Sequence, residues 1–233
     1  MNNQLTHINR QTAVIFGLLL IAGIICGVFS SVLPIEEADY LSQLQSIESE
    51  ILVAVFFQAA MAVIYVAVAV VTYPIVKMDS HESALAYVAF RLVGAAFLFI
   101  GIVMLLLFIP LGNQFAQAND NNRQSIEVMG AFLRITRDGF NHIGMVLPWT
   151  IGGLLLYKAF LNTGLIPRWL SYWGLGAMAL TLVATLLYML NQIELVSVTY
   201  FALNMPTALL DITLAIYLIA RGFRPAASTA DAA

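Results

Sequence analysis

Six apolar segments of about 20 residues or more divide this sequence, and they constrain its fold more than any other feature. They cover about residues 13–33, 51–73, 84–109, 140–160, 170–190 and 198–220. A helix of about 20 apolar residues crosses the hydrocarbon core of a bilayer, which is roughly 30 Å thick. We therefore predict an all-α polytopic membrane protein with one bundle of six transmembrane helices over residues 1–224 and a disordered tail at 225–233.

The composition agrees with a lipid environment. Of the 233 residues, 61% are hydrophobic and 10% are charged, whereas a soluble domain carries about 25% charged residues. The competing interpretation of the first segment is a secretory signal peptide, with Arg10 as its basic region. That segment is too long for a usual signal and lacks a clear A-x-A site after it, so we favour a transmembrane helix.

The basic residues predict the orientation of the chain. If the N-terminus lies inside, the inner side collects Arg10, Lys77, Lys158, Arg168, Arg221 and Arg224. The outer side then holds Arg123, joined by Arg134 and Arg137 if these lie at the outer interface. Short cytoplasmic loops are enriched in Lys and Arg, so we expect both termini in the cytoplasm.

Local signals predict where the spans end. We expect residues 34–50, which carry five carboxylates and no Lys or Arg, to form a loop. Pro74 should end the second span, and Pro110 with Gly112 should close the third. Residues 113–124 read as a solvated loop. Residues 125–136 read as a short amphipathic helix at the interface that leads into the fourth span.

Two charged residues lie inside predicted spans at matched depth. Arg91 in the third span and Asp211 in the sixth lie about 10–15 Å from the cytoplasmic side at 1.5 Å per residue. Isolated charges in a bilayer are costly, so such residues usually face the bundle and find partners. We expect them to pair, either as an ion pair that locks two helices or as a proton relay or anion site. The remaining alternative is that Arg91 snorkels to the inner face.

A second polar cluster opens the fourth span and consists of Arg134, Arg137, Asp138, Asn141 and His142. Arg134, Asp138 and His142 follow an i, i+4, i+8 spacing, which places them on one face of a regular helix. One interpretation is an interfacial cap in which Asp138 bridges Arg134 and His142. The other is the mouth of an outward-facing polar pocket with His142 as its titratable group.

Proline also interrupts two spans. Pro148 and Pro206 each remove a backbone hydrogen bond and should kink the helix. Asn204 and Thr207 flank the second position, and a broken helix with polar neighbours can build a site at the middle of the membrane. Such a kink is more often structural, with Ser or Thr satisfying the freed carbonyl.

Several functional classes find no support in the sequence. No HxxxH, HExxH or CxxC pattern is present, and the other histidines, His7 and His81, lie on the opposite side from His142 in this topology, so we expect no metal site. We also expect no cofactor, because phosphate-binding, dinucleotide-binding and nucleophile-elbow patterns are absent. The net charge of −3 gives no reason to expect nucleic acid as a partner. The single cysteine, Cys26, lies in an apolar run and reads as a packing residue.

Three segments carry a resemblance to a known family: AYVAFRLVGAAFLFIG, GLLLYKAFLNTGLIPRWLSYWGLGAMA and MPTALLDITLAIYLIARGF. They resemble a bacterial membrane family catalogued as domain of unknown function 4386. In that pattern the corresponding residues here are Arg91, His142, Gly153, Pro167, Arg168, Pro206 and Asp211. The sequence departs at Asp211, where Glu is usual, and at Thr163, where Ser is usual. The resemblance implies a six-helix protein of the bacterial inner membrane and implies no reaction.

Three functions remain open at this point. The protein could be a non-enzymatic bundle that binds or transports a small or lipidic ligand in a polar intramembrane pocket. It could be a structural or accessory subunit whose buried charges only hold the bundle together. It could also be an intramembrane enzyme that uses His142 with Asp138, or Asp211 with Arg91. The bilayer is the one partner that the sequence predicts directly, and it leaves the oligomeric state undefined.

Overall fold

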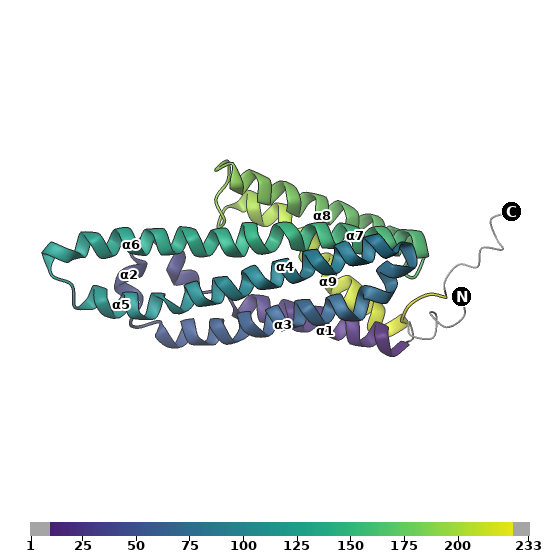
Figure 1. Cartoon of the computed structure of the whole chain (residues 1–233), viewed down its shortest axis with the longest axis horizontal. Coiled ribbons are helices and arrows are strands. Elements are labelled where there is room, and N and C mark those ends of the chain that lie inside the picture. Colours follow the sequence, from purple (N-terminus) through teal and green to yellow (C-terminus); the bar gives the residue numbers. More distant parts are fainter. Residues whose placement is uncertain (1–9, 226–233) are drawn as a thin grey trace.

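The fold was examined in a computed structural model of the chain, which describes residues 10–225. Helices make up nearly all of this part (Figure 1). They are α1 (Arg10–Phe29), η2 (Leu33–Glu36), α2 (Tyr40–Gln43), α3 (Glu48–Asp79), α4 (His81–Leu106), α5 (Phe108–Ala116), α6 (Asp120–Asp138), η3 (Gly139–Met145), α7 (Val146–Thr163), α8 (Arg168–Met189) and α9 (Val198–Arg221). The predicted tail at 225–233 lies almost entirely outside the described residues.

The prediction of six membrane-spanning helices is confirmed. Within residues 10–225, six continuous helical stretches are long and apolar enough to cross a bilayer. Two of them, His81–Ala116 and Asp120–Thr163, contain 36 and 44 residues. These correspond to lengths of about 54 and 66 Å, well beyond a hydrocarbon core of roughly 30 Å. Both stretches therefore project out of the membrane at one end.

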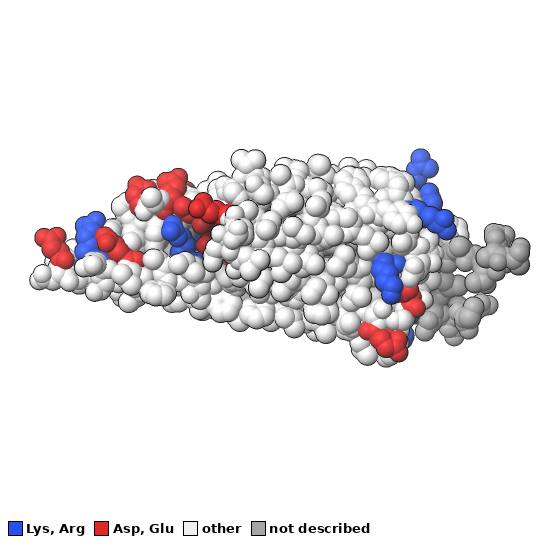
Figure 2. All heavy atoms as spheres, turned by 90° about the horizontal axis from the view of Figure 1, so that it is seen from above, with Lys and Arg blue, Asp and Glu red and all other residues white. Residues whose placement is uncertain are grey.

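The two ends of the bundle differ in structure. One end, which we call the terminal end, contains the start of α1, the end of α9 and the α3–α4 and α7–α8 connections. The start of α1 and the end of α9 lie close together there, since a Cβ built on Gly222 would lie 3.8 Å from Cγ of Arg10. At the distal end, the chain between α1 and α3 folds against the projecting α5 and α6 (Figure 1). Figure 2 shows charged residues gathered at these two ends, with an uncharged belt between them that fits the bilayer.

An apolar core fills the terminal half of the bundle. Phe16, Tyr87, Phe160 and Leu170 are completely buried there, and the rings of Phe16 and Phe160 stack at 6.4 Å. α8 approaches α7 closely because Gly174 has no side chain: a Cβ at that position would lie 2.1 Å from Cδ1 of Tyr157. The Tyr87 hydroxyl is satisfied by Thr72 at 2.5 Å. This core closes the interior toward the terminal end.

A second core lies at the distal end, beneath the chain between α1 and α3. Ile35, Leu44, Ile51 and Phe108 are completely buried in it. Residues 34–50, predicted as a loop, therefore include the short helices η2 and α2, whose apolar residues cover α5 and α6. A Cβ on Gly112 would lie 2.6 Å from Cβ of Leu44, so glycine at this position permits the close contact.

Three predicted helix ends were wrong. Pro74 lies inside α3, which continues to Asp79 because Ile75 and Val76 are completely buried against the core. Pro110 lies in the first turn of α5, where a missing backbone N–H costs little. The predicted loop at 113–124 shrinks because α5 extends to Ala116 and α6 already begins at Asp120.

The predicted interfacial helix at 125–136 is part of a longer structure. The Asn119 side chain accepts a hydrogen bond from the Asn122 backbone N–H, and the Asn122 side chain accepts one from that of Asn119, which forms a capping box for α6. From there α6, η3 and α7 run as one continuous helical stretch to Thr163.

Candidate functional site

A cavity of about 450 Å³ lies within the bundle, between α1, α3, α4, α7, α8 and α9. Most of its wall is apolar or aromatic. The polar members of the wall are Arg91, Asp211, Asn204, Thr181, Thr207, Tyr65, Tyr157 and Ser31. Phe16, Leu156, Tyr157 and Met178 belong both to the wall and to the buried terminal core, so they form the floor of this central cavity.

Arg91 is held in the cavity wall by aromatic rings. Its side chain comes from α4 and the residue is 6% exposed. Cζ lies 5.0 Å from the ring centroid of Trp149 and 5.4 Å from that of Tyr87, at cation–π distance. Gly152 on α7 allows this approach, since a Cβ there would lie 3.3 Å from Nε. No hydrogen bond to the guanidinium comes from residues 10–225, and its Nε is buried.

Asp211 faces the same cavity from α9. Among the described residues it has no hydrogen-bond partner and no ion pair. Thr207, one turn away, shares a hydrogen bond of 2.8 Å with Thr181 of α8 and also donates to the Ala177 carbonyl. The amide of Asn204 donates to the Tyr200 carbonyl. Thr207 and Asn204 of α9 therefore have partners, whereas the Asp211 carboxylate faces the cavity.

Arg91 and Asp211 thus line one cavity, but the direct contact that we expected from their matched depth is absent. Ion pairs within 4.0 Å among residues 10–225 do not include these two side chains. The guanidinium lies over the Trp149 and Tyr87 rings instead. Their role as a binding pair stays a prediction.

A second cavity, of about 310 Å³, adjoins the first toward the distal end. Gly27, Ser31, Tyr65 and Met145 line both cavities. The wall of this distal cavity includes Glu36, Gln58, Arg137, Asn141, His142 and Tyr200. Of the five residues that we expected around an outer polar pocket, Arg137, Asn141 and His142 line this cavity, whereas Arg134 and Asp138 do not. Their role in a pocket stays a prediction.

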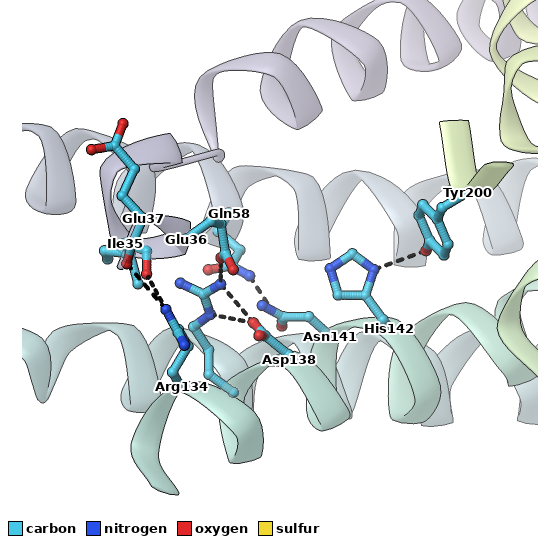
Figure 3. A network of polar contacts seen from close by, with 10 residues as sticks. Ile35, Glu36, Glu37, Gln58, Arg134, Asp138, Asn141, His142 and Tyr200 are labelled. Carbon is cyan, nitrogen blue, oxygen red and sulfur yellow. Dashed lines mark hydrogen bonds and ion pairs between the residues drawn. The ribbon is translucent and has the colours of Figure 1, made fainter. Parts of the chain in front are cut away.

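Figure 3 shows the polar cluster, in which Glu36 and Asp138 share the partner Arg137. Its guanidinium pairs with Glu36 of η2 and donates two hydrogen bonds, of 3.0 and 2.6 Å, to Oδ1 of Asp138. Arg137 and Asp138 are 8% and 7% exposed. A buried cation between two carboxylates is well compensated, so this contact ties the chain between α1 and α3 to the α6–η3 junction.

The other members of the cluster point to different partners. Arg134 donates to the carbonyls of Ile35 and Glu37, and its Cζ lies 4.9 Å from the Tyr40 ring centroid. The Gln58 amide of α3 donates to the Asn141 side chain at 3.2 Å, and Nδ1 of His142 lies 2.9 Å from the Tyr200 hydroxyl of α9 (Figure 3). Asn141 also packs against Gly101, where a Cβ would lie 2.0 Å from its Oδ1.

The proposed bridge from Asp138 to Arg134 and His142 was therefore wrong. The i, i+4, i+8 spacing assumes a regular α-helix, but residues Gly139–Met145 form a π-helix. Its wider turn rotates every later side chain relative to α6, so His142 no longer lies above Asp138. π-helical turns are often found at functional sites, and Pro148 follows this one after a short interval.

Sequence reasoning missed several residues of the site. Glu36 was one of the five carboxylates of the expected loop, and neither Gln58 nor Tyr200 was among the candidate site residues. In each of their contacts with the polar cluster, the two partners are separated by between 58 and 101 positions in the sequence, so a local sequence pattern does not reveal them. Trp149 was also outside the candidate site residues, although its ring lies beside the guanidinium of Arg91.

Within residues 10–225 no group of three or more His, Cys, Asp or Glu side chains is placed to hold a metal ion. His7 lies outside these residues.

The fold and its charged cavity define the class of the molecule: a polytopic α-helical membrane protein with six membrane-spanning helices and polar residues in its interior. Residues 15–222 match the family described as Domain of unknown function (DUF4386). Because this match covers most of the sequence, the chain belongs to that family. No curated protein matches the chain, and no solved structure matches it.

Proposed function

We propose that this protein binds a small or lipidic ligand inside the membrane, as a non-enzymatic binding or transport-type bundle. One observation carries the proposal: Arg91 and Asp211 face the same cavity of about 450 Å³, and neither side chain has a hydrogen bond or ion pair within residues 10–225. A charge inside a bilayer costs at least about 2.5–3.5 kcal/mol on insertion scales, and such residues usually mark functional sites. A ligand would supply the missing partners.

The surroundings of the pair support binding more than structural locking. At the distal network, Arg137 has two carboxylate partners, so its charge has a structural role. Arg91 instead has two aromatic rings, which tolerate a cation without neutralising it. The accessory-subunit alternative therefore fits the distal network and leaves the central pair unexplained.

The enzyme alternative has less support. His142 bonds to Tyr200 and Asp138 bonds to Arg137, so the suggested His142–Asp138 pair is not assembled. For Arg91 and Asp211, no hydrogen bond within residues 10–225 joins the Asp211 carboxylate to a hydroxyl group of the wall, so no nucleophile is paired with this base. Binding is the simpler role for both charges.

We further propose that both termini lie in the cytoplasm of a bacterial cell, with the protein in the inner membrane. The α3–α4 and α7–α8 connections and the end of α9 have basic residues at or near them, namely Lys77, Lys158, Arg168 and Arg221. The positive-inside rule assigns this terminal end to the cytoplasm. The distal end, with its carboxylates and the Arg137 network, then faces the opposite side. Access to the central cavity would come from that side or from the bilayer, since the terminal core closes its floor.

Native mass spectrometry tests the proposal. The protein is purified in mild detergent from its own host, as wild type and as Arg91→Met and Asp211→Asn. We expect a bound mass on wild type that is lost from both variants. Arg123→Met is the control, because Arg123 forms an exposed pair with Glu127 on α6 and lines neither cavity. A wild-type protein without any retained mass, or a mass retained equally by all four proteins, would contradict the proposal.

A further inference from the structure

The mouth of the central cavity identifies where a ligand can enter. Residues that line the cavity and are also exposed mark its opening. These are Val28 on α1, which is 67% exposed, Ser31 just after α1, and Ala208 on α9. Ala208 lies within the membrane-spanning helix α9, and Val28 lies near the distal end of α1. We infer that the opening faces lipid along α9 and reaches the distal membrane interface near Ser31.

The opening results from how α1 and α9 pack. Near the terminal end they touch closely at Gly17, where a Cβ would lie 2.8 Å from Cγ1 of Ile219 and 3.0 Å from the Ala215 carbonyl oxygen. Further along α1, Gly23 and Gly27 contact α3 instead, and a Cβ on Gly23 would lie 3.7 Å from Ile64. The cavity wall between Gly23 and Ser31 on one side and Asn204 to Asp211 on the other is therefore a slit between diverging helices.

The slit has an apolar body and an inner end with two opposite charges. Leu20, Ile24 and Val28 of α1 line its length, whereas Arg91 and Asp211 lie at its depth. At 1.5 Å per residue, Arg91 lies about 15 Å along α4 from His81, and Asp211 about 15 Å along α9 from Arg221, which is close to the middle of the membrane. A ligand group that is anionic and accepts hydrogen bonds would suit Arg91, and a cationic ligand group that donates them would suit Asp211.

We propose that the slit binds a zwitterionic phospholipid, with its phosphate toward Arg91, its ammonium toward Asp211 and an acyl chain along α1 and α9. This inference rests on the proposed ligand-binding function and specifies the ligand. A water-soluble molecule with a phosphate and an ammonium group, such as phosphoethanolamine, offers the same two charged groups. A lateral opening toward lipid, lined by apolar side chains, favours the lipid source.

Fluorescence quenching of Trp149 tests the proposal, because this indole lies in the cavity beside Arg91. Trp169→Phe and Trp173→Phe leave it as the only tryptophan. This protein is placed in phosphatidylglycerol vesicles that contain a small fraction of a guest lipid with brominated acyl chains. The guest is phosphatidylethanolamine in one series and phosphatidylglycerol in the other. We expect the ethanolamine lipid to quench Trp149 strongly and the glycerol lipid to quench it much less.

Variants separate the site from general contact with lipid. Gly23→Val should fill the slit without a backbone clash and remove most of the quenching. Gly176→Val is the matched control, since Gly176 is exposed on α8 with open space beyond it, and quenching should stay at the wild-type level. Asp211→Asn should require about tenfold more ethanolamine lipid for half-maximal quenching, as expected for loss of one charge-assisted contact.

Three results would overturn the lipid proposal. They are equal quenching by the two guest lipids, quenching that Gly23→Val leaves unchanged, and no quenching in wild type. Soluble phosphoethanolamine distinguishes the source: if it alone shifts Trp149 emission while brominated lipids do not quench, the ligand comes from water. In that case, native mass spectrometry would still show a bound mass that depends on Arg91, and the proposed function would stand without the lipid.

Discussion

The guanidinium of Arg91 lies over the indole of Trp149, with Cζ 5.0 Å from the ring centroid. This contact holds a buried cation at the cavity wall without neutralising it. The nearest formal anion on the same cavity, Asp211, forms no ion pair with it within residues 10–225. The arrangement suits a protein in which both charged side chains bind a ligand.

The distal network provides the first prediction. Glu36→Ala removes the carboxylate that joins η2 to Arg137 and should lower the free energy of unfolding by about 1–3 kcal/mol, the usual cost of losing a charged hydrogen bond. Thermal unfolding in detergent measures the change. Glu37→Ala is the control, because its exposed side chain accepts a hydrogen bond only from Gln43 among the described residues. Equal losses of unfolding free energy in the two variants would contradict the prediction that the Glu36–Arg137 contact stabilises the fold.

The packing of Tyr40 against α6 provides a second prediction. A Cβ on Gly130 would lie 2.6 Å from the Tyr40 hydroxyl oxygen, which is buried and has no hydrogen-bond partner within residues 10–225. Gly130→Ala should therefore destabilise the distal end by about 1–3 kcal/mol. Tyr40→Phe should restore most of that loss in the double variant, which a double-mutant cycle of unfolding free energies will show. Additive effects would mean that the two residues do not meet.

Titration of the Tyr40 hydroxyl should make the free energy of unfolding depend on pH in the alkaline range. Burial raises the pKa of the Tyr40 hydroxyl, and the nearby Arg134 partly opposes the rise. A folded-state pKa above the unfolded value stabilises the protein below the unfolded pKa of about 10, and this contribution is lost as pH rises through the folded pKa. Tyr40→Phe should make stability less sensitive to pH above about 10. An unchanged alkaline profile would contradict this assignment.

The contact between Gly101 and Asn141 provides a third prediction. Gly101→Ala would place a Cβ 2.0 Å from Oδ1 of Asn141, so the side chain must move and its hydrogen bond with Gln58 is lost. We expect a loss of about 1–3 kcal/mol in unfolding free energy. Gly139→Ala is the control, because nothing lies within 4 Å of a Cβ at that position. If Gly139→Ala proves as harmful as Gly101→Ala, helix geometry rather than the Asn141 contact is responsible.

The proposed orientation gives a fourth prediction. In a Cys26→Ser background, which is free of cysteine, single cysteines are placed at Gln192 and Glu82, both exposed and at opposite ends of the bundle. A membrane-impermeant maleimide added to intact cells should label Gln192→Cys and not Glu82→Cys, and lysis should expose both. Labelling of Glu82→Cys alone in intact cells would invert the topology.

Much of this fold could be predicted from the sequence because the signals are local. Apolar length defines the spans, and the predicted bounds of the fifth and sixth helices, 170–190 and 198–220, differ little from Arg168–Met189 and Val198–Arg221. The helix end predicted at Pro74 was wrong because burial of the following residues of α3 outweighs the backbone hydrogen bond that proline lacks. Span ends therefore follow from packing as well as from residue type.

The site was only partly predictable because its contacts are long-range. From their depth in the sequence we predicted that Arg91 and Asp211 pair. Both line one cavity, but the sequence could not show that the guanidinium would lie over the rings of Trp149 and Tyr87. The π-helix at Gly139–Met145 changed which side chains of the polar cluster share a face. A regular helical period cannot reveal such a turn.

A structure of the wild-type protein, purified from its host and determined by electron cryomicroscopy with a bound antibody fragment, tests the central claim most directly. The account predicts density for a bound molecule in the central cavity, within hydrogen-bond distance of both the Arg91 guanidinium and the Asp211 carboxylate. A guanidinium that donates directly to Asp211, with no molecule between them, would make the pair a structural lock and contradict the account.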